Sequence, residues 1–353
     1  MSQKSSQAHQ STGQTPQPIK YDLAKGTILD ADSNPLLLQS VRQAELYLAA
    51  NLYDKSYPPA AGICKFLETA REIAQIEDFA SVATPSCGAF QVALQVLKNA
   101  KINTVVTRSP TWFMYAAFCA ENGVILVESE LGLLELAKQL QPGEALLLQA
   151  GCYNPDGADL TRAEFAAIAE IVKAKRGFVL LDIAYQGVKC SILEDNAFTS
   201  LYGANIVVMQ FFDKNFGIYA EGASAVHFSD KLAQLELEGM VERKFGIVPV
   251  HGQYLVSTVW SKFRDMYLAE MDEVRALVRG KRELLSSNMD KVCLTSSIMQ
   301  QNGIYAFLDF NEQQMEECQT LGLKLAPRGR VNLCGINAEN VRSVCDILKT
   351  VMQ

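Results

Sequence analysis

Two ionisable side chains in this chain lie at or just beyond the ends of apolar runs of the length of a buried strand. Lys214 follows the run at 206–212, and Asp182 follows the run at 178–181. A lysine partly removed from water has a lowered pKa and can act as a nucleophile. A buried carboxylate needs a cationic or protonated partner. The pair indicates covalent or proton-transfer chemistry, against the simpler interpretations of a surface lysine and a helix cap.

Two further segments could contact a ligand. Ser86, Cys87 and Gly88 follow the apolar run at 79–83 and precede a helical pattern. Free backbone N–H groups at a helix start attract anions, although such residues can equally form a plain N-cap. Trp112 lies after the run at 104–107 and can stack on a planar ligand or simply pack in the core.

Asn154 and Arg330 complete the set of candidate residues. Asn154 precedes Pro155, which favours an extended backbone and so fixes the direction of its amide. Arg330 enters a predicted strand near the C-terminus, where a guanidinium group can bind a carboxylate. Viewed alone, the first has the simpler interpretation of a turn and the second that of a surface ion pair.

The elements that must position these residues alternate between strand and helix. Helical patterns separate most of the apolar runs, so we expect an α/β fold with a mainly parallel sheet, buried on both faces. In such sheets ligands bind beyond the carboxyl ends of the strands. The predicted strands lie at residues 79–83, 104–107, 124–127, 145–149, 178–183, 206–212 and 223–228.

The two ends of the chain differ from this central part. Residues 1–20 are polar and are expected to form a disordered tail. The last 75 or so residues alternate between helix and strand and predict a smaller α+β unit. We expect a large domain over 35–275 and a small domain from 21–34 plus 276–353.

Composition excludes several classes of function. The chain has 353 residues and a formal net charge of −7, which disfavours a duplex nucleic-acid binder. It contains no apolar run long enough to span a membrane and no signal peptide, so no membrane association is expected. Nine scattered cysteines without a CxxC motif indicate reduced thiols and a cytoplasmic location. The three histidines are far apart, which argues against zinc.

The order of the candidate segments resembles that of the aspartate/aromatic aminotransferases. These are pyridoxal phosphate (PLP) enzymes of fold type I. The resemblance runs from about Tyr21 to the C-terminus. Its most specific part is the segment Lys-Asn-Phe-Gly-Ile-Tyr-Ala-Glu at 214–221, taken with Asp182 and Tyr185.

The resemblance implies the transfer of an amino group between an amino acid and a 2-oxo acid. Lys214 would form a Schiff base with the cofactor and move the proton. Asp182 would keep the pyridine nitrogen protonated, so that the ring withdraws electrons. Trp112 would stack on the ring, while Asn154 and Tyr185 would contact its hydroxyl oxygen.

The resemblance also implies how the ends of the site are built. The phosphate would lie against Ser86, Cys87 and Gly88. The substrate carboxylate would bind Arg330, with Gly26 and Asn154 nearby. Tyr57 would reach the phosphate in the neighbouring subunit, so a homodimer is expected.

Three departures from the family pattern fall at the phosphate. The family has an arginine where this chain has Gly222, and a hydroxyl residue where it has Phe211. The loop Pro85-Ser86-Cys87 replaces a Ser-Gly-Thr-like run. Because one charge-assisted contact contributes about 1.5–3 kcal/mol, we expect PLP to bind about ten- to a hundredfold more weakly. Arg108 is a candidate for compensation.

The resemblance also implies that a residue of the neighbouring subunit meets the substrate side chain, which would be Glu242 or Arg243 depending on the register of the comparison. Two alternatives to an aminotransferase stay open. One is another PLP-dependent reaction, such as that of a decarboxylase or lyase, because the same electron-withdrawing ring serves them all. The other is a non-catalytic protein on an eroded fold.

Overall fold

The computed structural model of the chain describes residues 18–30, 32–51, 55–230, 233–289 and 294–353. Most of the predicted polar tail at 1–20 therefore lies outside the described residues. Residues 18–20 have neither helical nor strand structure.

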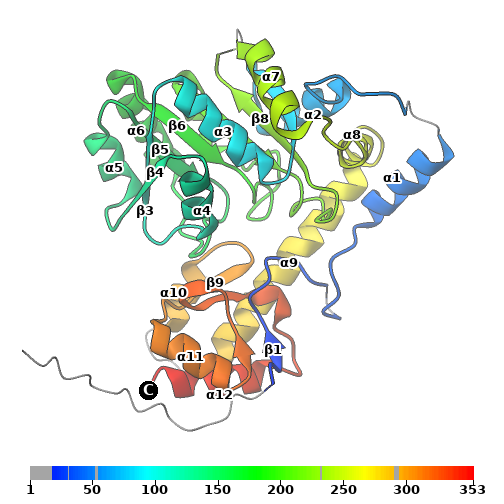
Figure 1. Cartoon of the computed structure of the whole chain (residues 1–353). Helices are drawn as coiled ribbons and strands as arrows, with labels where there is room; N and C mark the ends of the chain where they lie inside the picture. Colours follow the sequence, from blue (N-terminus) through cyan, green and yellow to red (C-terminus); the bar gives the residue numbers. More distant parts are fainter. Residues whose placement is uncertain (1–17, 31, 52–54, 231–232, 290–293) are drawn as a thin grey trace, which may run out of the picture.

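The large unit is built on a seven-stranded sheet with the strand order β2-β8-β7-β6-β5-β3-β4 (Figure 1). Neighbouring strands are parallel from β7 to β4, whereas β8 runs antiparallel to both β2 and β7. The prediction of a mainly parallel sheet is confirmed. The strands are β2 (Ala80–Pro85), β3 (Thr104–Arg108), β4 (Ile125–Ser129), β5 (Glu144–Gln149), β6 (Phe178–Asp182), β7 (Asn205–Phe211) and β8 (Ala223–Phe228).

Hydrophobic clusters cover both faces of this sheet. In β6, Leu180 belongs to one cluster, whereas Val179 and Leu181 belong to the other. This alternation explains why the strands read as continuous apolar runs. The helices of the large unit are α1 (Gln39–Ala50), α2 (Cys64–Ala74), α3 (Gly88–Asn99), α4 (Met114–Glu121), α5 (Leu133–Gln139), α6 (Arg162–Lys175), α7 (Gln234–Phe245) and α8 (His251–Lys262), with a 3₁₀ helix at Ala197–Gly203.

The C-terminal unit has its own hydrophobic cluster, which includes Leu23 from the N-terminal segment. Both ends of the described chain meet there, because β1 pairs with β10 and β9 pairs with β11. Its elements are β1 (Tyr21–Asp22), α10 (Leu294–Gln300), β9 (Tyr305–Phe307), α11 (Glu312–Thr320), β10 (Leu323–Lys324), β11 (Arg330–Asn332) and α12 (Val341–Val351), with 3₁₀ turns at Pro327–Gly329 and Leu333–Gly335.

The long helix α9 (Arg264–Asn288) joins the two units (Figure 1). It runs without a break through the predicted boundary at residues 275–276. The domain limits themselves stay a prediction. No helix in the described part of the chain is both long enough and apolar enough to cross a membrane.

A histidine on β8, the second strand from one edge of the sheet, makes stability depend on pH. His227 is fully buried, with Nδ1 at 2.9 Å from Ser81 Oγ and Nε2 at 3.1 Å from Gln210 Oε1. Burial, together with the charge of Arg71, lowers its pKa to about 3. In the unfolded chain the ring takes up a proton near pH 6.5. Stability should therefore fall as pH drops from about 6.5 towards 3, because only the unfolded state binds the proton in this range.

Replacing the His227 imidazole with an amide should reduce the loss of unfolding free energy at low pH. Between pH 7 and pH 5 we expect the wild type to lose about 2 kcal/mol more unfolding free energy than His227→Gln. Urea titrations at the two pH values measure this difference. The control is His251→Gln, at the partly exposed start of α8, which should keep the wild-type pH dependence. Equal declines in all three proteins would contradict the prediction.

Candidate active site

A cavity of about 390 Å³ lies where the carboxyl ends of the parallel strands face the C-terminal unit. Its walls come from the ends of β5, β6 and β7, from the start of α4 and from the C-terminal unit. Nine of the eleven residues predicted for the site line it, the exceptions being Gly88 and Tyr57. The full lining is Ala24, Gly26, Thr27, Ser86, Cys87, Trp112, Phe113, Met114, Tyr115, Gln149, Asn154, Asp182, Ala184, Tyr185, Phe211, Lys214, Tyr305 and Arg330.

Asp182 is the last residue of β6 and is almost fully buried. Its Oδ2 accepts a hydrogen bond from the Tyr115 hydroxyl at 2.6 Å, and its Oδ1 accepts one from the Ala184 N–H at 2.9 Å. Burial raises the pKa of Asp182, although these two bonds and the charge of Lys214 oppose the rise. A buried carboxylate of this kind favours a ligand that brings a cationic N–H group.

Tyr115 was missed by the sequence analysis. It lies three residues after Trp112, one helical turn away, and its ring contacts Trp112 edge-on at 5.1 Å between centroids. That spacing is the signal that would have identified it.

Lys214 lies in the turn after β7 and is half-buried at the cavity wall. Its Nζ is 5.9 Å from the centroid of the Tyr185 ring. Within the part of the chain that the structure describes, this amine has neither a hydrogen bond nor an ion pair. A desolvated lysine without an acidic partner in direct contact can react with an electrophile.

Arg330 is the first residue of β11 and belongs to the wall that the C-terminal unit forms. Its Nη1 donates to Asn154 Oδ1 at 2.9 Å, and its Nη2 donates to the carbonyl of Ala24 at 3.1 Å. The guanidinium lies over the Tyr305 ring at 4.1 Å. Its Nε is buried and has no partner among the described residues. This donor fits an acceptor brought by a ligand, such as a carboxylate.

Tyr305 and Gly26 close the same wall. The hydroxyl of Tyr305 lies 2.8 Å from that of Tyr185, a contact between the two units that the sequence did not predict. A Cβ atom on Gly26 would lie 2.5 Å from the Tyr305 hydroxyl, so a larger residue would displace this ring. Gly26 therefore keeps space for Tyr305.

The sequence profile of the family described as "Aminotransferase class I and II" matches residues 18–348. The chain belongs to this family. The family and the fold class predicted from the sequence are both confirmed.

Curated relatives cover nearly the whole chain. Aspartate aminotransferase of Escherichia coli is 26% identical over 95% of this chain and 94% of its own length. Aromatic-amino-acid aminotransferase of Paracoccus denitrificans is 27% identical over 92% and 91%. The solved structure of an aromatic-amino-acid aminotransferase from Burkholderia pseudomallei, covalently bound to pyridoxal phosphate, has a TM-score of 0.87 at 24% identity, covering 96% of this chain and 94% of that chain.

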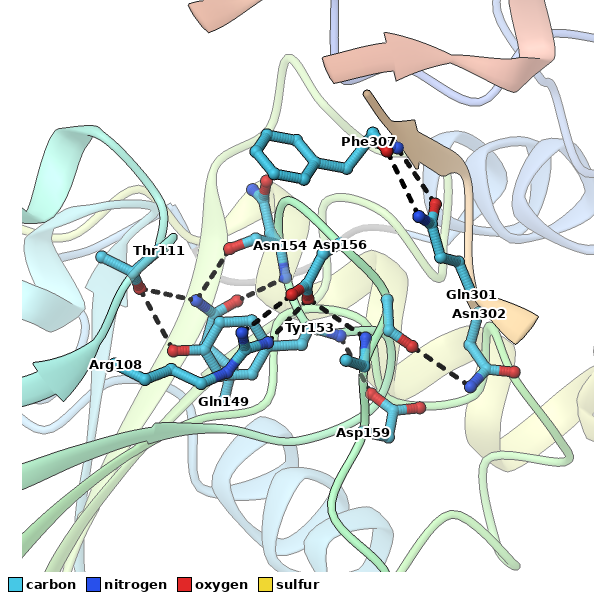
Figure 2. Close-up of polar contacts among 12 residues, drawn as sticks. Arg108, Thr111, Gln149, Tyr153, Asn154, Asp156, Asp159, Gln301, Asn302 and Phe307 are labelled. Carbon is cyan, nitrogen blue, oxygen red and sulfur yellow. Dashed lines mark hydrogen bonds and ion pairs between the residues drawn. The ribbon is translucent and has the colours of Figure 1, made fainter. Parts of the chain in front are cut away.

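The loop that carries Asn154 is fixed by the side chain of Gln149 (Figure 2). Gln149 Oε1 accepts the Asn154 N–H at 2.9 Å, while its Nε2 donates to the Asn154 carbonyl at 3.1 Å. Gln149 is the last residue of β5 and was also missed by the sequence analysis. Because Arg330 occupies Asn154 Oδ1, the free group of this amide is its Nδ2 donor.

Arg108 does not supply the charge that the aminotransferase family places at the phosphate. Its guanidinium binds both oxygens of Asp156, at 2.6 and 2.8 Å, and lies 3.7 Å from the centroid of the Tyr153 ring (Figure 2). Arg108 does not line the cavity. Its suggested role in compensation is therefore wrong, because the strand end directs this side chain to a different partner.

The predicted phosphate end is formed by Ser86 and Cys87 at the cavity wall, with α3 beginning at Gly88. Gly88 does not line the cavity, because the Phe245 and Pro85 rings lie 2.8 and 3.0 Å from where its Cβ would stand. It can therefore contribute only its backbone N–H. Gly222 lies next to Ser86 and accepts its N–H at 2.7 Å.

Three predicted residues lie away from this cavity. Tyr57 is 87% exposed. Glu242 and Arg243 are exposed on α7. Any contact they make with a substrate or with a second subunit stays a prediction. In the described part of the chain, no group of three histidine, cysteine or acidic side chains is placed to hold a metal ion.

Proposed function

We propose that this aminotransferase uses PLP to move an amino group between an amino acid and a 2-oxo acid. One observation carries the proposal: Lys214, Asp182 and Arg330, from three different elements, converge on a single cavity. The two curated relatives described above, both named as aminotransferases, support it. No observation favours a decarboxylase, a lyase or a non-catalytic protein.

The ring end of the cavity fits this cofactor. PLP supplies an aldehyde that combines with an amine and a protonated ring that withdraws electrons from the bonds of the substrate Cα. Lys214 presents an amine without a direct acidic partner, and Asp182 presents a buried carboxylate that favours a cationic N–H group. The free Nδ2 of Asn154 and the hydroxyl of Tyr185 are the donors for the ring oxygen.

Each of these residues then has one task. Asp182 holds a proton on the ring nitrogen by its charge. Lys214 Nζ would take the proton from the substrate Cα when the amino acid becomes a 2-oxo acid, and would deliver a proton to Cα in the reverse half-reaction. Arg330 binds the α-carboxylate and so fixes which Cα bond faces the ring. Trp112, which precedes α4 and lines the cavity, would cover the ring and exclude water from that face.

We expect Arg330→Gln to raise the KM of both the amino acid and the 2-oxo acid by about ten- to a hundredfold, because a charge-assisted contact is lost. The dissociation constant of PLP should change little, since Arg330 binds substrate. Steady-state kinetics with both substrates measures the effect. The control is Arg328→Gln, which removes an exposed arginine of the same segment that pairs with Asp309. A KM unchanged in Arg330→Gln would contradict the assignment.

The function itself is tested in two steps. The purified protein is titrated with PLP, treated with borohydride and digested, and the labelled peptide should contain Lys214. Single amino acids are then added to the PLP-loaded protein without a 2-oxo acid. We expect one equivalent of 2-oxo acid per site, and a second 2-oxo acid should reverse the change. Labelling with release of carbon dioxide or an eliminated group would indicate a decarboxylase or lyase, and no labelling would indicate a non-catalytic protein.

The proposal includes a cytoplasmic homodimer. Tyr57 is exposed and lies outside the cavity of its own chain, which supports a role across an interface. The scattered cysteines support a reducing compartment. Light scattering of the full chain measures the assembly, and Tyr57→Phe should weaken PLP binding if the hydroxyl reaches the neighbouring site.

A further inference from the structure

A buried carboxylate lies behind the phosphate end of the cavity, bonded to the lining residue Ser86 but not itself lining the cavity. Asp213 directly precedes Lys214, is 5% exposed and was not identified from the sequence. Its Oδ2 accepts the Ser86 hydroxyl at 2.9 Å, and its Oδ1 has no partner among the described residues. The cations that line the cavity in the described chain are Lys214 and Arg330, both assigned to other tasks. This end therefore has a negative neighbour and no guanidinium of its own.

The hydroxyl hydrogen of Ser86 is not available to a phosphate. A hydroxyl has one hydrogen, which Ser86 donates to Asp213, so it offers only lone pairs to the cavity. The backbone N–H of Ser86 is also used, by Gly222. The remaining donors are the N–H groups of Cys87 and Gly88, which bind no described residue. A phosphate dianion only accepts hydrogen bonds, whereas a ligand hydroxyl can donate one to Ser86.

We propose that Asp213 adapts this end of the pocket to an uncharged hydroxyl group, so that the chain binds pyridoxal nearly as tightly as pyridoxal phosphate. Pyridoxal is the same cofactor aldehyde with a hydroxymethyl group in place of the phosphate ester. The inference rests on the proposed function, because it requires the ring to bind between Asp182 and Lys214. It goes beyond that function by naming the form of the cofactor that the chain accepts.

The electrostatics of Asp213 agree with this assignment. Burial raises the pKa of its carboxyl, while the charge of Lys214 and the Ser86 hydrogen bond lower it. The other ionisable groups near it are the Cys87 thiol and the Tyr219 hydroxyl, which are uncharged when protonated. An ionised Asp213 accepts from Ser86 and repels a dianion. The measurements below are made at pH 8, which favours this ionised form.

The test compares two ligands on full-length protein freed of cofactor. Dissociation constants for pyridoxal phosphate and for pyridoxal are measured from the absorbance of the bound aldehyde and from tryptophan fluorescence. In the wild type we expect the two constants to differ by less than about tenfold. In Asp213→Asn, pyridoxal phosphate should bind about ten- to a hundredfold more tightly, while pyridoxal should change little. The control is Asp195→Asn, which removes a buried carboxylate bonded to the Gly187 N–H and not to Ser86, and it should leave the ratio unchanged.

Ser86→Ala gives a second, independent outcome. If Ser86 only accepts from the ligand, pyridoxal should bind several-fold more weakly and pyridoxal phosphate should be unaffected. Loss of pyridoxal phosphate affinity in this variant would show that Ser86 donates to the phosphate and would overturn the proposal. Circular dichroism checks folding, and Asp213→Ser replaces Asp213→Asn if the latter does not fold.

Different results would contradict this inference and the proposed function. If the wild type binds pyridoxal phosphate more than about a hundredfold more tightly than pyridoxal, and Asp213→Asn changes nothing, the inference is wrong and the aminotransferase stands. If neither aldehyde becomes attached to Lys214, both are wrong.

Discussion

Replacing Lys214 with alanine is expected to lower kcat for amino-group transfer by at least about 10⁴-fold, because one side chain both reacts with the cofactor and moves the Cα proton. The amine is half-buried at the cavity wall and has no described partner that would hold its place in the fold. Stability should therefore change little, and activity should be lost in a folded protein. Steady-state kinetics and thermal unfolding of the same preparation measure the two effects.

An added small amine separates the chemical role of Lys214 from a structural one. Methylamine should restore part of the lost rate in Lys214→Ala, because a free amine fits the space left by the side chain and can accept the proton. Lys262→Ala, on the exposed end of α8, is the matched lysine control and should keep wild-type activity. A Lys214→Ala variant that retains more than about one hundredth of the activity would rule out this residue as the proton carrier.

Asp182→Asn should lower kcat by about 10³-fold while the PLP dissociation constant changes much less, because the amide lacks the charge that holds a proton on the ring nitrogen. The amide oxygen can still accept from the Ala184 N–H, and the NH2 group can donate to the Tyr115 hydroxyl oxygen, so both contacts keep a partner. Kinetics and absorbance titration separate the two constants. A kcat within about fivefold of the wild type would contradict the role given to this carboxylate.

Tyr115→Phe provides the graded comparison for Asp182. It removes one hydrogen bond to the carboxylate and leaves its charge in place. Because that bond lowers the pKa of Asp182, its loss should raise this pKa further. We expect kcat to fall by about tenfold, far less than in Asp182→Asn.

The strands were predictable because most are buried on both faces. β8 was predicted with the bounds that the structure shows, and β6 ends at the carboxylate that the pattern singled out. β4 is different, since Ile125 is 61% and Val127 41% exposed at the edge of the sheet. An apolar run indicates that a segment favours a strand, but it does not indicate whether that strand lies at the edge of the sheet.

Most of the site was predictable from residues that lie at a strand end or in the turn that follows it. Lys214, Asp182 and Asn154 meet that condition, and all three line the cavity. Tyr305 lies inside a short strand, and its partner Tyr185 is 120 residues away in sequence. Such a contact depends on how the two units pack, which no local pattern encodes. Arg108 shows the reverse, because its position at a strand end did not reveal that Asp156 would bind it.

The pairing of β9 with β11 has a mechanical consequence. In this pair of strands Asn332 is opposite Tyr305 and Arg330 is opposite Phe307. Arg330 and Tyr305, which both line the cavity, are therefore held in one hydrogen-bonded unit. Helix α9 continues from the large unit into the C-terminal unit without a break and connects the two. If the C-terminal unit rotates relative to the large unit, Arg330 and Tyr305 move together. The contact of Arg330 with a carboxylate and the hydrogen bond of Tyr305 with Tyr185 then form or break at the same time.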